Sequence, residues 1–163
     1  MISDFDVTLL YAVLDEKRES LGLSWSGVAK EIEHNYAKVA VSTIKGIREK
    51  GSVEGDGCLQ MFLWLGRSPE SFVPGLVADK CCDLEEPSNG VLRFDVPKVY
   101  RLLDAKRREE DLTWGQMAEM IDGFTAQMLK GFEKGRRTSF PKIMRITILL
   151  DVPVKELTMV SSW

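Results

Sequence analysis

The chain has 163 residues and a formal net charge of −3, with 44% hydrophobic and 29% charged residues. This balance is typical of a soluble globular protein and excludes disordered and fibrous classes. No apolar run approaches the roughly 18 to 20 residues of a membrane span. The segment 1–6 has neither the basic region nor the apolar stretch of a signal peptide, so we expect a cytoplasmic protein.

The cysteines and the one histidine do not indicate a metal site, because Cys58, Cys81, Cys82 and His34 lack paired ligand spacing. We expect no metal and no cofactor. Cys58 lies in an apolar helical pattern and is expected to be a core thiol. Cys81 and Cys82 are expected to stay reduced, the alternative being a redox-active pair or an intermolecular disulfide. The chain has no nucleophile motif or glycine-rich phosphate loop, so we expect no enzyme.

An internal repeat covers nearly the whole chain. Phe5-Asp6-Val7 recurs as Phe94-Asp95-Val96, and the two segments then stay in register through two expected helices. Matching pairs include Tyr11 with Tyr100, Leu14 with Leu103, Lys17-Arg18 with Lys106-Arg107, Trp25 with Trp114, and Ile32 with Ile121. Further along, Ile44-Lys45-Gly46-Ile47 matches Leu129-Lys130-Gly131-Phe132. The repeat predicts two copies of one domain.

Each copy reads as a series of short helices with apolar residues at helical spacing. In the second copy Asp95 is a candidate N-cap, and Thr113 and Thr125 are candidate caps for the next two helices. Gly135 suits a helix end, and residues 143–150 predict a strongly apolar fourth helix. The pattern predicts an all-α fold.

The predicted organisation has a first domain over residues 1–75, a linker over 76–92 and a second domain over 93–163. The linker is rich in turn-forming residues and carries four carboxylates. When extended it could bridge one turn of DNA. Alternatively its middle, residues 76–84, forms a helix that packs on one domain.

The second copy resembles the phage-repressor family of helix-turn-helix proteins, which includes lambda repressor, Cro and the XRE proteins. The resemblance rests on the run from Leu112 to Ile121, on Thr125 to Leu129, on the exit Glu133-Lys134-Gly135-Arg136-Arg137, and on the end from Ile143 to Leu157. It implies two tandem lambda-repressor-like helix-turn-helix domains of about five short helices each.

The resemblance also implies a DNA-binding surface, because such a motif lays its second helix in the major groove. In the second copy the DNA-facing residues would be Thr113, Trp114, Thr125, Ala126, Gln127, Lys130, Lys134, Arg136 and Arg137. Gln127 is the expected base reader, and the basic residues would neutralise phosphates. Trp114, like Trp25, stands where the family often has a polar phosphate contact, so its role is either in the core or on the DNA backbone.

The first copy departs further from the family. Ile32 and Ile44 are separated by more residues than Ile121 and Leu129, and we expect the insert around His34 to enlarge the turn between the two DNA-facing helices. The candidate contacts here are Val41, Ser42, Thr43, Lys45, Arg48 and Lys50. For the basic residues of the second copy, the alternative is that lysines and arginines at helix ends are only a solvated face.

Charge separates the two copies, because residues 1–75 and 76–92 each have a net charge of −3 whereas residues 93–163 have +3. We therefore expect the second copy to be the stronger DNA binder. The predicted function is a sequence-specific regulator of transcription, a repressor, that reads adjacent half-sites, with a homodimer as a further option. The alternative is an antitoxin-like or anti-activator module in which the acidic first domain holds a protein partner.

Overall fold

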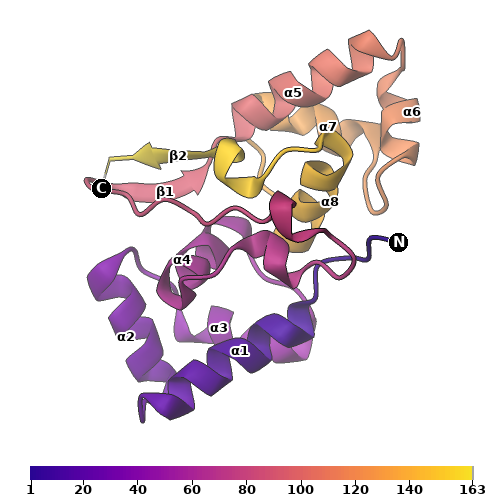
Figure 1. Ribbon diagram of the computed structural model, residues 1–163. Coiled ribbons are helices and arrows are strands. Elements are labelled where there is room, and N and C mark those ends of the chain that lie inside the picture. Colours follow the sequence, from indigo (N-terminus) through magenta and orange to yellow (C-terminus); the bar gives the residue numbers. More distant parts are fainter. Residues whose placement is uncertain (163) are drawn as a thin grey trace.

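The computed structural model describes residues 1–162 and shows a mostly helical chain (Figure 1). Within this range there are eight α-helices, α1 to α8, and one two-stranded antiparallel sheet. The sheet pairs β1 (Val91–Phe94) with β2 (Thr158–Ser161), with Val91 opposite Ser161 and Phe94 opposite Thr158. The predicted helical class is therefore confirmed, whereas the sheet is a departure from the all-α prediction.

The first copy contains α1 to α4 and a 3₁₀ helix. Their bounds are α1 Val7–Ser20, α2 Trp25–Asn35, α3 Val41–Lys50, α4 Gly55–Leu65 and the 3₁₀ turn Pro69–Phe72. Asp6 caps α1 and Ser24 caps α2, each by accepting a first-turn N–H. Gly51 and Gly66 end α3 and α4 in the left-handed conformation.

The second copy has the same elements in the same order. They are α5 Val96–Glu109, α6 Trp114–Glu119, α7 Ala126–Gly131 with the 3₁₀ turn Phe132–Lys134, α8 Phe140–Leu150 and the 3₁₀ turn Val154–Leu157. The predicted caps Asp95, Thr113 and Thr125 each accept a backbone N–H at the start of a helix. The backbone N–H of Asp6 donates to Phe72 O at 2.8 Å, and that of its equivalent Asp95 donates to Leu157 O at 2.7 Å.

The insert in the first copy does not enlarge the turn, so that expectation was wrong. Helix α2 has 11 residues whereas α6 has 6, and the segments that follow, 36–40 and 120–125, differ little in length. His34 lies in the last turn of α2, on the surface. The extra residues extend the helix because nothing between Ile32 and Asn35 breaks it, whereas Gly123 follows α6 closely.

An aromatic and ionic cluster recurs in both copies. In the first, the ring centroids of Tyr11 and Trp25 lie 5.3 Å apart, and the Arg18 guanidinium covers the Trp25 ring at 5.0 Å. Tyr100, Arg107 and Trp114 repeat this arrangement at 5.4 Å and 4.9 Å. Both tryptophans are half-buried. Each cluster ties the first helix of its copy to the second through packing and cation–π contacts.

The two copies share a continuous hydrophobic core, built where α4 faces α8. The Phe140 ring packs against Phe5, Phe62 and Phe94 with centroid distances of 5.0, 5.4 and 5.9 Å. Phe140 is fully buried. Phenylalanines from both copies therefore form one cluster, and the arrangement of the copies is fixed by packing rather than by a tether.

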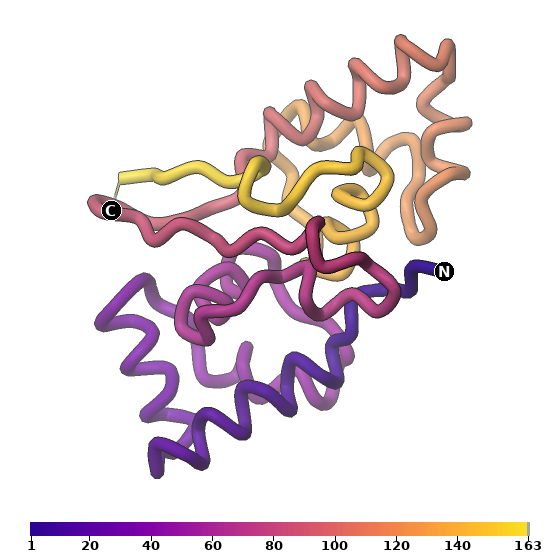
Figure 2. The backbone as a smooth tube through the Cα atoms, in the orientation of Figure 1, coloured from indigo at the N-terminus to yellow at the C-terminus, as the bar shows by residue number. Residues whose placement is uncertain are grey.

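The predicted linker packs against the protein. Figure 2 shows that it runs between the two copies rather than away from them. Lys80 forms an ion pair with Asp151 at 3.0 Å, and the buried Glu70 accepts N–H bonds from Cys82 and Val154. Its last two residues belong to β1, and its middle holds only the 3₁₀ turn Ala78–Lys80. Among residues 1–162, no helix combines the length and apolarity needed to cross a membrane.

Candidate nucleic-acid interface

Helix α7 presents the predicted base-reading residues on one exposed face. Thr125 caps the helix by accepting from Met128 N at 3.2 Å, while Leu129 anchors the opposite face in the core. Gln127 and Lys130 are exposed, and Ala126 is half-buried. The amide of Gln127 is thus carried on a short, firmly packed helix, with no hydrogen bond to the described chain.

Helix α3 occupies the equivalent place in the first copy. Its buried side is formed by Ile44, Gly46 and Ile47. The exposed predicted contacts are Ser42, Lys45, Arg48 and Lys50, and the half-buried ones are Val41 and Thr43. The structure therefore leaves the predicted contacts of both helices at or near the surface.

Six cations on α3, on α7 or just after α7 have no carboxylate partner among the described residues. Within residues 1–162, no ion pair involves Lys45, Arg48, Lys50, Lys130, Lys134 or Arg136. By contrast, Arg18 and Arg107 on α1 and α5 pair with Asp15 and Asp104 at 2.7 and 2.8 Å. Unpaired cations are available to neutralise phosphates. Three of them are on α3, which also carries Glu49, and one, Lys130, is on α7.

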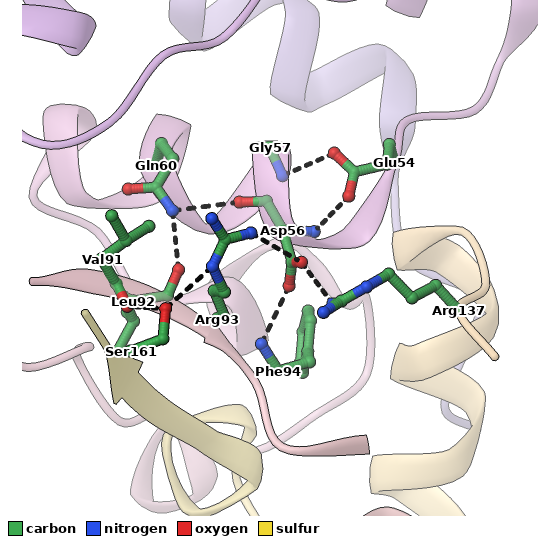
Figure 3. A network of polar contacts seen from close by, with 10 residues as sticks. All are labelled: Glu54, Asp56, Gly57, Gln60, Val91, Leu92, Arg93, Phe94, Arg137 and Ser161. Carbon is green, nitrogen blue, oxygen red and sulfur yellow. Dashed lines mark hydrogen bonds and ion pairs between the residues drawn. The ribbon is translucent and has the colours of Figure 1, made fainter. Parts of the chain in front are cut away.

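Arg137 has a partner that the sequence did not reveal. Its guanidinium forms an ion pair with Asp56 at the start of α4, and Arg93 approaches the same carboxylate oxygen at 3.7 Å (Figure 3). The other oxygen of Asp56 accepts from Phe94 N at 2.9 Å. Arg137 thus links the copies, although its half-exposed side chain keeps donors free for a phosphate. Asp56 carries no recognisable motif, and only the fold brings it to Arg137.

The predicted contacts at the start of α6 are engaged within the protein. Thr113 and Gln116 form a reciprocal capping box, with bonds of 3.1 Å to Gln116 N and 2.8 Å to Thr113 N. The Trp114 ring packs on Tyr100 and under Arg107. Thr113 remains exposed at the helix end, whereas Trp114 contributes to the repeated aromatic cluster.

The structure brings the two predicted recognition helices to one furrow. A hollow of about 400 Å³ is lined by Ser42, Thr43, Gly46, Lys50, Ser52, Val53, Glu54, Arg137, Thr138 and Ser139. A neighbouring hollow of about 340 Å³ is lined by Phe124, Thr125, Gln127, Met128, Phe132, Arg136, Arg137 and Thr138. The hollow beside α3 and the hollow beside α7 share Arg137 and Thr138, and we call the two hollows together the furrow. In Figure 1 both helices lie on the more distant side, behind α1 and α5.

Comparisons with protein-family models, with curated proteins and with solved structures found no match to this chain.

Proposed function

We propose that the protein is a sequence-specific double-stranded DNA-binding regulator of transcription, a repressor, built from two lambda-repressor-like helix-turn-helix units. The observation that carries this proposal is the pair α3 and α7, which hold equivalent places in the repeat and border one furrow. Each exposes at least one cation, Lys45, Arg48 and Lys50 on α3 and Lys130 on α7, that forms no ion pair within residues 1–162. A helix with its N-terminal residues exposed and its opposite face buried is suited to enter a major groove.

The packing of the copies supports an intrachain pair of readers. Because α4 and α8 hold the copies together, α3 and α7 keep a fixed separation. A pair of readers on one face of DNA would address half-site centres about 34 to 36 Å apart, or a multiple of that distance. The half-sites should differ, since Ser42 stands in α3 where Gln127 stands in α7.

Selection from a randomised duplex pool tests the proposal. The purified chain is expected to enrich a bipartite motif with constant spacing. The winning duplex should bind at least about 10³-fold more tightly than a scrambled one at physiological salt. Binding no tighter than to scrambled DNA, together with stoichiometric capture of a protein partner, would replace DNA recognition with the antitoxin-like or anti-activator function.

A further inference from the structure

A third hollow, of about 690 Å³, lies beside the furrow and is lined mainly by the first copy. We call it the α2–α4 groove. It is lined by Glu33, Ala37, Lys38, Val39, Ala40, Thr43, Glu54, Asp56, Gly57, Gln60, Val91, Arg93 and Arg137. Its volume is within the range of about 300 to 1,000 Å³ that is usual for small-molecule sites.

Three departures from the internal repeat meet at this groove. The lengthened end of α2 contributes Glu33 to the lining, and the segment that follows it contributes Ala37 and Lys38. Ala40 stands where the second copy has the capping residue Thr125, and Gln60 stands where it has Arg145. The second copy keeps the same helix order without these features. The shared fold therefore does not require them, and a role confined to the first copy accounts for them.

The groove is lined by three cations, Lys38, Arg93 and Arg137, and by three carboxylates, Glu33, Glu54 and Asp56. Ala40 begins α3 without a side-chain cap, so the first turn lacks the bond that Thr125 gives to α7. Arg93 and Arg137 converge on Asp56, which can balance only one of them, and Lys38 also lines the groove. Glu54 is occupied in capping α4, where it accepts from Asp56 N and Gly57 N at 3.1 and 2.8 Å. Glu33 is exposed on α2. A helix N-terminus with adjacent guanidinium groups suits a phosphate.

Gln60 provides an independent indication of a ligand. Its side chain is almost completely buried, and Nε2 donates to Leu92 O at 2.8 Å and to Asp56 O at 3.2 Å. These two carbonyl acceptors fix the amide orientation. The Oε1 atom, on the other side of the amide in Figure 3, is the one buried side-chain polar atom without a partner among the described residues. A buried acceptor of this kind is costly unless a donor reaches it.

From these features we propose that the α2–α4 groove binds a small phosphate ester that also carries hydrogen-bond donors, of the nucleotide class. The phosphate lies at the start of α3, near Arg93, Arg137 and Lys38, and a donor of the ligand satisfies Gln60 Oε1. This site does not depend on DNA binding. It shares Thr43, Glu54 and Arg137 with the furrow, so an occupant contacts both copies beside α3.

Calorimetric titration with the four nucleoside 5′-monophosphates and with inorganic phosphate tests the site. At least one nucleotide should bind more tightly than phosphate alone. Ala40→Thr should weaken that binding by about tenfold, because the new hydroxyl competes with the anion for the first-turn N–H groups, of which that of Thr43 already donates to Ala40 O at 3.0 Å. Because Thr125 caps α7 in this way, the variant should melt no lower than the parent chain. Lys38→Glu should also weaken binding, whereas Lys30→Glu, an exposed position on α2 outside the groove, should not.

Two results would overturn the proposal. One is the absence of nucleotide binding to the folded parent chain. The other is nucleotide binding that Ala40→Thr and Lys38→Glu leave unchanged. If Ala40→Thr weakens DNA binding while no nucleotide binds, the phosphate at α3 belongs to the DNA backbone, and the small-ligand site is refuted while the DNA-binding function stands. Nucleotide binding without DNA binding would support the site and reject the proposed function.

Discussion

Glu54 and Ser139 hold equivalent positions, immediately before α4 and α8, and they pair with each other in an antiparallel β-bridge. Next to it, Phe140 N donates to Val53 O at 2.8 Å. A residue that pairs antiparallel with its own repeat equivalent lies beside a local two-fold axis. The two copies are thus related by rotation at this point, and we expect the half-sites of a bound duplex to run in opposite directions.

The ion pair across this axis should matter for stability. Asp56 is largely buried and accepts from Phe94 N as well as from Arg137, so Asp56→Ala leaves a backbone donor and two cations without their acceptor. We expect the free energy of unfolding in urea to fall by about 2 kcal/mol. Arg137→Gln should cost less than about 1 kcal/mol, because the arginine side chain is half-exposed. Equal losses for both variants would contradict this assignment.

The phenylalanine cluster should make the two copies unfold together. Phe140→Ala removes the ring that contacts Phe5, Phe62 and Phe94, and is expected to cost about 3 to 5 kcal/mol. Hydrogen exchange followed by mass spectrometry should show faster exchange in α1 and α4 as well as in α8. Leu9→Ala, at an exposed position of α1, serves as the control. Faster exchange confined to the second copy would mean that the copies are separate folding units.

The roles proposed for α7 and for the 3₁₀ turn after it can be separated by two substitutions. Gln127→Ala should reduce discrimination between the selected and scrambled duplexes by about 1 to 3 kcal/mol, because it removes a side-chain reader of base edges. Lys134→Ala should weaken both duplexes alike and reduce the magnitude of the salt slope by about 0.9. Fluorescence anisotropy over a salt series measures both quantities. If Gln127→Ala affected both duplexes equally, Gln127 would not read bases.

Much of the fold could be predicted from the sequence because its signals are local. Helical periodicity and caps such as Asp95, Thr113 and Thr125 indicated where helices begin, and the repeat transferred these assignments to the first copy. The expectation that the insert enlarges the turn was wrong because Glu33 to Asn35 suit a helix end and a turn almost equally. Only the structure shows that α2 continues to Asn35.

Contacts between segments that are far apart in the sequence could not be predicted from local sequence patterns. Strands β1 and β2 have four residues each, too short for a clear alternating pattern, and their partners are far apart in sequence. The bond between Asp56 and Arg137 likewise depends on how the two copies pack. For the predicted interface, sequence identified exposed residues on α3 and α7, but it did not predict the shared furrow or the orphaned oxygen of Gln60.

The buried carboxyl of Glu70 should make stability depend on pH. Burial raises its pKa above the usual range, although N–H bonds from Val154 and Cys82 oppose this effect and the nearby Asp83 adds to it. Because the folded pKa exceeds the unfolded value of about 4.3, the contribution of Glu70 to stability is fully present below that value. It is lost as the pH rises through the folded pKa, because ionisation is easier in the unfolded chain.

The measurement is urea unfolding of the parent chain and of Glu70→Gln at a series of pH values. Gln cannot ionise, and it keeps an acceptor for only one of the two N–H groups, so its absolute stability is expected to differ. The informative quantity is the difference in the free energy of unfolding, parent minus variant. This difference should fall as the pH rises above about 4.3. The total fall should be about 1.36 kcal/mol for each tenfold difference between the acid dissociation constants of Glu70 in the folded and unfolded chain. A difference that stays constant or increases with pH would show that folding does not raise the pKa of Glu70.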